Sequence, residues 1–378
     1  MKYYIIAGEA SGDLHASNLM RELMRRDPGA SFRCWGGDMM EKQGATLVKH
    51  YRELAFMGFS EVLMNIRTIS GNLRLCYKDI SEYQPDVIIL VDYPGFNLRI
   101  AKYAKKSGFR VFYYISPQVW AWKQSRVKKI RKYVDRMYVI LPFERNFYKR
   151  FGMDVDFVGH PLLDAISEQE LRRDSFENFT RKNRLSERPI IAVLPGSRKQ
   201  EIKVKLPLML GMKKHFPDYQ FIVAGAPSLE ESFYRDTAGC KDFSILFGQT
   251  YEILQHATAA MVTSGTATLE AALFNVPEAV CYKSTGPVSY YIARSLIRVR
   301  FISLVNLIMD KEVVKELIQD DLTPLNLKEE MDKILFNSDF RAGMLDEFRK
   351  LRTELGGPGA SGRAAELMYT ALTGSQGI

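Results

Sequence analysis

The chain has 378 residues, which is long enough for two domains that each bury a hydrophobic core. Its composition, 46% hydrophobic and 26% charged residues, is typical of a soluble globular protein. No apolar run approaches the ~18 residues that a membrane-spanning helix needs, so we expect no transmembrane segment.

The N-terminus carries one lysine and a very short apolar run before Gly8, which is too short for the apolar region of a signal peptide. The four cysteines are far apart and form no C-x-x-C motif, which argues against disulfides and against a cysteine-based metal site. We therefore expect an intracellular protein.

The formal net charge is +9, and part of the excess lies in KQSRVKKIRKY, residues 123–133. Such a basic patch suits a nucleic acid, an anionic lipid or a phosphorylated ligand. The alternative is a solvated helix face, because charge runs often have no further role.

Short apolar runs alternate with helical patterns along the whole chain. Continuous apolar runs, rather than alternating ones, indicate strands that are buried on both faces of a parallel sheet. Strands separated by helices predict βαβ units and a doubly wound α/β fold. The predicted strands are YYIIAG, DVIILVD, RVFYYIS, RMYVIL and DFVGH in the first half, and IIAVLPG, QFIVAG, FSILFG, AAMVTS and AVCYK in the second.

The polar segment near residues 165–188 predicts a linker between two Rossmann-like halves. After it, IIAVLPGSRKQEI repeats the strand, glycine turn and helix of IIAGEASGD, residues 5–13. A turn of this kind usually cradles a phosphate. The first copy carries Glu9 and Asp13, which would repel one, whereas the second copy carries Arg198.

Asp92 follows the apolar run VIILV, which places its carboxylate at the end of a buried strand. There it could deprotonate a substrate hydroxyl. The alternative is an aspartate that caps a helix or closes a turn.

Two later turns predict a nucleotide site. In LPGSR, Gly196 lets the backbone approach a ligand, Ser197 can donate a hydrogen bond, and Arg198 suits phosphate oxygens. A helix that starts at Lys199 would add its free N–H groups. In VTSGTATLEAALF, the turn Ser264, Gly265, Thr266 leads into a helix whose Glu270 could accept both ribose hydroxyls. A surface arginine and a solvated glutamate are the alternatives.

Other candidate sites are weaker. Asp154 and Asp156 of DVD precede a strand rather than follow it, so we expect no metal there. His15 and His160 follow glycine turns, where either could touch a ligand, but we expect a hydrogen-bonded structural histidine at each position. Residues 54–80 are unusually apolar, and this pattern fits either a core face or a surface that enters a membrane interface. Its apolar side chains include Phe56, Met57, Phe59, Val62, Leu63 and Ile66.

The turns above belong to a longer series of motifs that spans nearly the whole chain in order. The series is GEASGD at 8–13, MGFSEVL at 57–63, DYPGFN at 92–97, SPQVWAW at 116–122, LPFE at 141–144, GHPL at 159–162, LPGSRKQEI at 194–202, SGTATLEAAL at 264–273 and SLVNL at 303–307. Together these motifs resemble the lipid-A-disaccharide synthase family, and SPQVWAW is the most specific of them.

The resemblance implies a GT-B fold, in which two Rossmann-like domains face each other across one cleft. It implies domains at 1–165 and 186–356, with a C-terminal helix at about 357–378 that returns to the first domain or exchanges between the subunits of a homodimer. The GGPGASG stretch at 356–362 would suit either path.

The implied reaction is an inverting, metal-independent transfer that needs no cofactor. It moves 2,3-diacylglucosamine from UDP-2,3-diacylglucosamine to diacylglucosamine 1-phosphate, forming a β-1,6-linked disaccharide 1-phosphate and UDP. The family works at the cytoplasmic face of the inner membrane, and no nucleic acid is involved.

Individual roles carry over with the motifs. Asp92 matches the essential aspartate and is the candidate general base, Arg198 matches the diphosphate arginine, and Glu270 matches the ribose glutamate. Asn306 matches an asparagine of the nucleotide site, although Val305 stands where many relatives have proline. The first half would then hold the acceptor, with Glu9 or Asp13 orienting the sugar or the catalytic loop. The acceptor-side candidates are Glu9, Ser11, Gly12, Asp13 and Asn97.

Two alternatives stay open at this stage. One is another GT-B enzyme that uses a UDP-sugar, such as a muropeptide-type transferase or an epimerase. The other is a nucleic-acid-binding or membrane scaffold protein that uses the basic patch.

Overall fold

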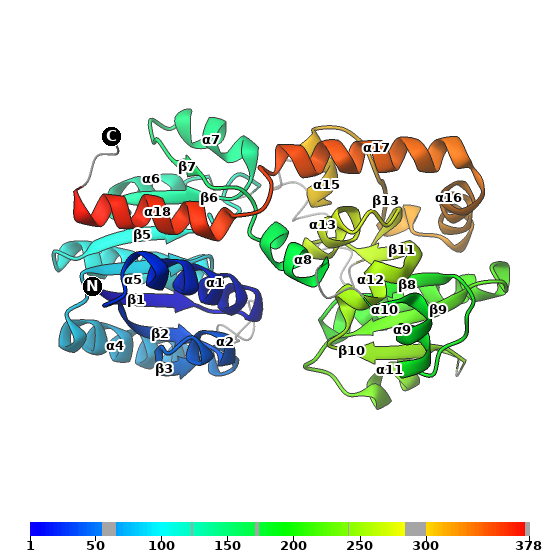
Figure 1. The fold of residues 1–378 in the computed structure, drawn as a ribbon, viewed down its shortest axis with the longest axis horizontal. Helices are drawn as coiled ribbons and strands as arrows, with labels where there is room; N and C mark the ends of the chain where they lie inside the picture. Colours follow the sequence, from blue (N-terminus) through cyan, green and yellow to red (C-terminus); the bar gives the residue numbers. More distant parts are fainter. Residues whose placement is uncertain (55–65, 122–123, 171–173, 241, 284–299, 375–378) are drawn as a thin grey trace. The chain divides into compact units, whose positions relative to one another are not determined.

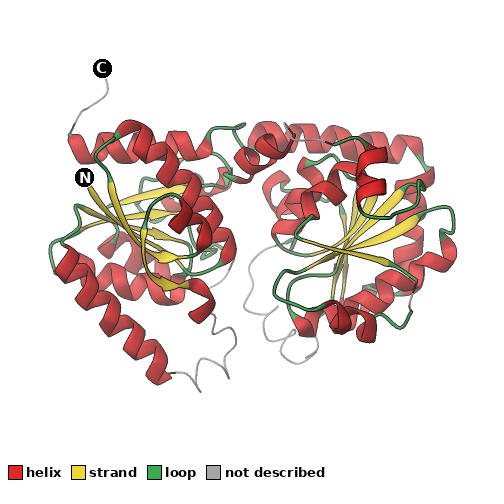
Figure 2. Cartoon of the chain, turned by 60° about the horizontal axis from the view of Figure 1, so that its bottom comes forward, coloured by secondary structure: helices red, strands yellow, loops and turns green. Residues whose placement is uncertain are grey.

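The structure is a computed structural model that describes residues 1–54, 66–121, 124–170, 174–240, 242–283 and 300–374. Its contacts divide the chain into two compact units: unit 1 is Met1–Asp164 with Leu355–Ile378, and unit 2 is Ala165–Glu354. Each unit is a parallel sheet with helices on both faces (Figures 1 and 2). The predicted α/β class is confirmed.

Unit 1 contains a seven-stranded parallel sheet with the order β3-β2-β1-β4-β5-β6-β7. Chain order reverses between β1 and β4, and such a switch point is where parallel sheets bind ligands. Ala7 and Val91 are register partners at the ends of these two strands, so Gly8 and Asp92 leave the sheet side by side. The strands are β1 (Lys2–Ala7), β2 (Ser31–Gly36), β3 (Thr46–His50), β4 (Val87–Val91), β5 (Arg110–Tyr114), β6 (Arg136–Val139) and β7 (Asp156–Phe157).

Unit 2 contains a six-stranded parallel sheet with the order β10-β9-β8-β11-β12-β13. Its switch point lies between β8 and β11, where Leu194 and Val262 are register partners. The loops that begin with Pro195 and Ser264 therefore meet at one edge. The strands are β8 (Ile190–Leu194), β9 (Gln220–Gly225), β10 (Ser244–Phe247), β11 (Ala257–Thr263), β12 (Glu278–Tyr282) and β13 (Lys315–Ile318).

The helices turn apolar faces toward these sheets. In unit 1 they are α1 (Ala10–Arg26), α2 (Asp38–Lys42), α4 (Ile66–Tyr83), α5 (Pro94–Lys106), α6 (Arg126–Tyr133), α7 (Pro142–Lys149) and α18 (Ala360–Thr373). In unit 2 they are α9 (Phe176–Lys182), α10 (Lys199–Leu210), α11 (Glu231–Thr237), α12 (Thr250–His256), α13 (Thr266–Leu273), α15 (Leu304–Met309), α16 (Pro324–Phe336) and α17 (Ser338–Glu354). Helix α8 (Leu162–Glu170) begins in unit 1 and ends in unit 2.

The segment predicted as a linker has helical structure. Residues 165–188 include most of α8 and all of α9. Phe179 of α9 is buried in the same hydrophobic cluster as Ile190 and Ile222 of the unit 2 sheet. Apolar side chains at only a few positions of a polar segment were enough to attach this helix to the core.

The ten predicted strands are all present, and the described residues contain three further strands that were not predicted. These are β2, β3 and β13, which the sequence analysis did not mark. Their sequences mix charged and apolar residues, as in TLVKH and KELI, and several of their side chains are only half-buried. Such strands lie at or near sheet edges, where the continuous apolar pattern is weakest.

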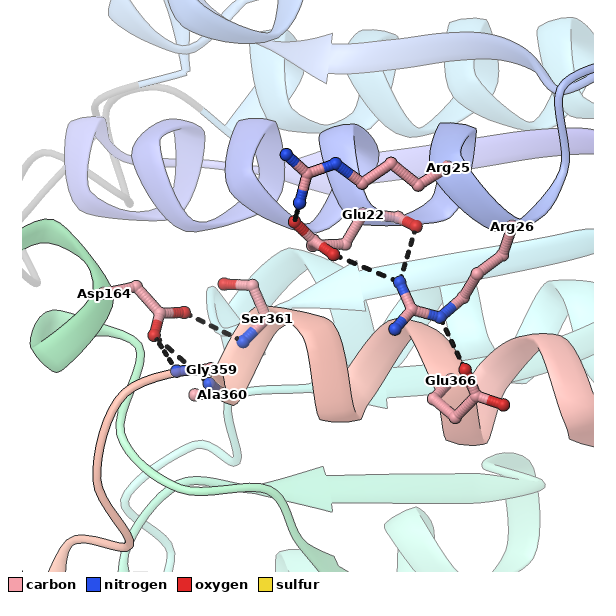
Figure 3. A network of polar contacts seen from close by, with 8 residues as sticks. All are labelled: Glu22, Arg25, Arg26, Asp164, Gly359, Ala360, Ser361 and Glu366. Atoms are coloured by element: carbon pink, nitrogen blue, oxygen red, sulfur yellow. Dashed lines mark hydrogen bonds and ion pairs between the residues drawn. The ribbon is translucent and has the colours of Figure 1, made fainter. Parts of the chain in front are cut away.

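The C-terminal helix α18 packs against α1 within unit 1 (Figure 3). Arg26 of α1 donates from Nε to Glu366 of α18, at 2.7 Å. At the other end, Asp164 accepts hydrogen bonds from the backbone N–H groups of Gly359, Ala360 and Ser361. A carboxylate at a helix N-terminus stabilises the helix dipole and its free N–H groups. Asp164 therefore anchors the start of the returning helix.

His15 and His160 lie in the interior of unit 1. His160 accepts a hydrogen bond at Nδ1 from the Leu162 N–H group, and its backbone N–H group donates to the carbonyl of Leu355, where the chain returns. Burial lowers the pKa of His160 to about 3 and that of His15 to about 4. Both imidazoles are therefore neutral at physiological pH, which fits the structural alternative for His160.

Candidate active site

The switch point of unit 2 holds a pocket of about 590 Å³. It lies at the ends of β8, β9 and β11, and at the first turns of α10 and α13. Seven of the eight residues predicted to bind a UDP-sugar line it: Gly196, Ser197, Arg198, Ser264, Gly265, Thr266 and Glu270. The fold thus brings together two turns that are about 70 residues apart in the sequence.

The turn after β8 has the geometry of an anion site. Gly196 has a φ of 107°, which would strain any other residue, and a Cβ placed there would lie 2.7 Å from Oε2 of Glu201 and displace that carboxylate. Helix α10 begins at Lys199, as predicted, with Arg198 as its N-cap residue. The Arg198 side chain is 64% exposed, and its Nη1 lies 3.7 Å from Oε1 of Glu201. N–H groups of the helix start and a guanidinium group thus flank the same turn.

The turn after β11 places a carboxylate beside the pocket. Gly265 has a φ of 127° and is the N-cap residue of α13. Glu270 is half-buried on this helix, and the Tyr251 hydroxyl donates to its Oε1 at 3.4 Å. Burial raises the pKa of Glu270 to about 7, which the hydrogen bond from Tyr251 partly opposes. A carboxylate here can accept hydrogen bonds from ligand hydroxyls.

Lys205 is a residue of this site that the sequence analysis missed. Its side chain is buried, and its ammonium group donates to the hydroxyl of Thr263, which lines the pocket. Helical spacing could have found it, because Ile202, Lys205, Leu206 and Met209 form the buried face of α10. A lysine on such a face needs a partner.

Asn306 is not among the described residues that line the pocket, and its predicted role in the nucleotide site stays a prediction. The side chain is fully buried, and protein groups use its hydrogen-bonding capacity. Its amide nitrogen donates to the Val314 carbonyl and to Glu316, and its oxygen accepts from the N–H groups of Val313 and Val314. An asparagine with two donor and two acceptor bonds in place has none left for a ligand. It fixes the connection between α15 and β13.

Asp92 stands at the switch point of unit 1 on a strained turn. Asp92 and Tyr93 have φ values of 41° and 47°, a region that non-glycine residues seldom adopt. The Asp92 carbonyl accepts hydrogen bonds from Asn97 Nδ2, at 2.8 Å, and from the Tyr113 hydroxyl. Strain of this kind persists where the surrounding structure holds it, and it clusters at functional sites.

The side chain of Asp92 is accessible to solvent, yet protein atoms crowd its carboxyl group. This partial loss of hydration raises its pKa to about 7, and the nearby charge of Glu9 acts in the same direction. An accessible carboxyl group with a pKa near neutrality can exchange protons with a substrate at physiological pH. Asn97, which was predicted on the acceptor side, is fully buried and supports the turn from behind.

The loop after β1 packs against neighbouring parts of unit 1. A side chain at Gly8 would collide with the ring of Tyr93, so the glycine permits the two switch-point loops to touch. Gly12 is buried and packs α1 against Ala7 of β1, whereas Ser11 is exposed. Glu9 is half-buried beside Asp92.

The proposed sugar-orienting role of Asp13 is not supported by its surroundings. The carboxylate is buried and accepts hydrogen bonds from the backbone N–H groups of Gly37, Met39 and Met40. These are the free N–H groups at the start of α2. Asp13 therefore caps a neighbouring helix, and the sequence alone could not show that its partners lie 24 to 27 residues away.

Two further motifs of unit 1 are joined by buried hydrogen bonds. Glu144 of LPFE accepts from the N–H groups of Ile140 and Leu141 at the start of α7. Ser116 of SPQVWAW lies 2.7 Å from the Tyr148 hydroxyl of the same helix. Burial raises the pKa of Glu144 to about 7. The contact between Ser116 and Tyr148 joins the loop after β5 to α7, which follows β6.

The predicted membrane-contact segment is described only in part. Phe56, Met57, Phe59, Val62 and Leu63 lie outside the described residues, and α4 begins at Ile66. Among the described helices, none is both long and apolar enough to cross a membrane. On α6, Lys128, Lys129, Arg131 and Lys132 are exposed, and Val127 and Ile130 are buried.

Asp156 lies at the start of β7, the end of the strand opposite the predicted ligand edge. In the part of the chain that the structure describes, no group of three or more histidine, cysteine, aspartate or glutamate side chains is placed to hold a metal ion.

A sequence profile described as "LpxB: Lipid-A-disaccharide synthetase" matches residues 3–364. The chain belongs to the lipid-A-disaccharide synthase family. Among similar members, the lipid-A-disaccharide synthase of Syntrophus aciditrophicus is 41% identical over 375 residues, which is 97% of each chain. That of Coxiella burnetii is 36% identical over 372 residues, covering 97% of this chain and 98% of the relative. The resemblance stated from the motifs is thereby confirmed.

Solved structures with lower sequence identity share the fold. A UDP-GlcNAc 2-epimerase from Neisseria meningitidis bound to UDP-GlcNAc gives a TM-score of 0.67 at 12% identity, covering 99% of this chain and 100% of that one. The calicheamicin glycosyltransferase CalG4 gives a TM-score of 0.62 at 16% identity, covering 100% and 99%. The fold of this lipid-A-disaccharide synthase family member is thus GT-B, and the chain is a glycosyltransferase of lipid A biosynthesis.

Proposed function

We propose that the protein transfers 2,3-diacylglucosamine from UDP-2,3-diacylglucosamine to the 6-hydroxyl of 2,3-diacylglucosamine 1-phosphate, with Asp92 as the general base. The products are the β-1,6-linked disaccharide 1-phosphate and UDP. The observation that carries the proposal is the strained turn at Asp92, where an accessible carboxyl group has a pKa of about 7.

The unit 2 pocket is the proposed site of the UDP moiety. Arg198 and the first N–H groups of α10 would bind the diphosphate at the Gly196 turn, and the start of α13 would contribute at Ser264 to Thr266. Glu270 would accept hydrogen bonds from the ribose hydroxyls. The grouping of these residues in one pocket of about 590 Å³ supports this assignment.

The proposed chemistry is a single displacement at the anomeric carbon. The acceptor O6 forms a bond to that carbon as its bond to the β-phosphate oxygen breaks, which inverts the configuration. The O6 proton passes to Asp92, and the electron pair of the breaking bond leaves with UDP. Arg198 and the helix N–H groups stabilise the charge that develops on the β-phosphate. A positioned base contributes roughly 10²–10⁴-fold to such a reaction.

The deciding experiment supplies the purified protein with defined UDP-2,3-diacylglucosamine and diacylglucosamine 1-phosphate, and identifies the products by mass spectrometry. We expect one disaccharide 1-phosphate and one UDP per turnover. Water-soluble UDP-N-acetylglucosamine, with and without an acceptor, is the matched control. Transfer or epimerisation of this sugar at a similar rate would instead favour another UDP-sugar enzyme of the same fold.

We also propose that the protein works at the surface of the inner membrane, on the cytoplasmic side. The exposed cations of α6 would attract anionic headgroups, and the apolar segment at 54–80 would contact the lipid. Co-sedimentation with vesicles that contain anionic lipid tests this. Replacing Phe56, Met57 and Phe59 with serine is expected to reduce binding, and unchanged partitioning would remove the segment from the proposal.

A further inference from the structure

The walls of the unit 2 pocket have an unexpected charge for a diphosphate site. Among the described residues that line it, the charged side chains are Arg198, Glu201 and Glu270. Glu270 stands on α13 beside the region proposed for the ribose, whereas Glu201 lies directly against the Gly196 turn. A UDP diphosphate would therefore meet one cation and, next to it, one carboxylate. The negative charge of Glu201 would repel the negatively charged diphosphate and so oppose its binding.

A second cation lies behind this wall. The Nζ atom of Lys205 is 3.7 Å from Oε2 of Glu201 and contacts the hydroxyl of Thr263. The lysine side chain is 2% exposed, whereas that of Glu201 is 35% exposed and lines the pocket. Burial lowers the pKa of Lys205, and the charge of Glu201 opposes that effect. The buried ammonium group and the pocket carboxylate thus stabilise each other.

We infer that Lys205 is a positioning residue of the diphosphate site, which neutralises Glu201 and holds it against the Gly196 turn. Arg198 is also 3.7 Å from Glu201, but through the other carboxylate oxygen. When the diphosphate binds, the exposed Arg198 turns to the phosphate oxygens and Glu201 keeps Lys205 as its counterion. Without Lys205, an uncompensated carboxylate faces the incoming diphosphate.

This inference rests on the proposed UDP site, and a double-mutant cycle tests it. The variants are Lys205→Met, Lys205→Gln, Glu201→Gln and the combinations of Glu201→Gln with each lysine variant. Lys203→Met is the matched control, because Lys203 is exposed on the same helix. The affinities for UDP and for uridine are measured by calorimetry. Uridine lacks phosphates, so it reports whether the pocket is folded.

Either neutral replacement of Lys205 is expected to weaken UDP about tenfold, which corresponds to ~1.4 kcal/mol, and to change the uridine affinity less than about twofold. Adding Glu201→Gln should restore the UDP affinity to within about threefold of the single Glu201→Gln variant, because the repelling charge is gone. Lys203→Met should bind both ligands as the unmodified protein does. The restoration is the decisive readout, since a lysine needed only for packing would not be rescued by removing a carboxylate.

Two results would overturn the inference. The first is a Lys205 variant that binds uridine normally and UDP undiminished. The second is a double variant that binds UDP no better than the lysine variant alone, which would mean that Lys205 contacts the phosphates itself or serves only to pack α10. Failure of the unmodified protein to bind UDP at all would instead overturn the proposed function, so the two failures are distinguishable.

Discussion

The loops after β1 and β8 occupy the same position in their sheets, yet they are used differently. Each follows a central strand at a switch point and leads into a helix. In unit 1 protein groups engage residues on both sides of this loop, because Tyr93 packs on Gly8 and Asp13 caps α2. In unit 2 the loop at Gly196 is open and lines a pocket. A glycine turn at a switch point therefore does not by itself make a ligand site. The neighbouring loops decide whether protein groups fill the space beside the turn or leave it open for a ligand.

We expect the largest effect from a substitution of Asp92, which follows β4 in unit 1. Asp92→Asn removes the base and keeps a side chain that tolerates the left-handed turn. Turnover is expected to fall roughly 10²–10⁴-fold, with the UDP affinity within about twofold of its original value. Initial rates and calorimetry measure the two quantities. Asp86→Asn, at the other end of β4, is the control and should keep its turnover. An Asp92→Asn enzyme with near-full turnover would remove Asp92 from the mechanism.

The next effect concerns the open loop of unit 2. Arg198→Ala should lower the UDP affinity roughly 10–100-fold, because hydrogen bonds to charged groups contribute about 1.5–3 kcal/mol each. Uridine binding should change little, since the guanidinium group flanks the Gly196 turn, where the diphosphate is proposed to bind, rather than the α13 end of the pocket. Calorimetry with the two ligands separates these outcomes. If the affinities for UDP and uridine fell equally, Arg198 would support the fold of the pocket rather than bind the diphosphate.

The same comparison shows how far the sequence could be interpreted. Turns after buried strands could be placed from their apolar runs, so the pocket residues Gly196, Arg198 and Glu270 were found as a group. Residues whose role depends on a distant partner could not. Asp13 and Asn306 have polar side chains at motif positions, but their hydrogen bonds go to backbone groups that only the folded chain brings near. Lys205 was missed because a lysine in a helix is usually exposed, so it was not expected to be a buried residue of the site.

A smaller effect should separate Asp13, which caps α2, from Asp92, the proposed general base. Asp13→Asn replaces a carboxylate that accepts three backbone hydrogen bonds with an amide whose NH₂ group cannot accept any. We expect a loss of about 1–3 kcal/mol in the stability of unit 1, seen as a lower thermal transition, and no change in the acceptor KM. Asp38→Asn, an exposed carboxylate in the same region, should have no comparable effect. A raised acceptor KM at unchanged stability would return Asp13 to the binding site.

The smallest expected effect concerns the influence of Glu9, in the loop after β1, on the pKa of Asp92, in the loop after β4. The negative charge of Glu9 disfavours the ionised form of Asp92 and so contributes to its raised pKa. The base acts when ionised, so kcat/KM should increase as the pH rises through about 7 and level off above it. Glu9→Gln removes the repulsion between the two carboxylates and should therefore move this midpoint to lower pH. The variant should therefore retain a larger share of its plateau rate at pH 6 than the unmodified enzyme does.

Glu41→Gln, which changes an exposed carboxylate on α2, is the control for a general change in charge. A midpoint that stays in place would show that the charge of Glu9 does not reach Asp92, and an acceptor KM that also stays constant would leave Glu9 without a role in either the base or the acceptor site.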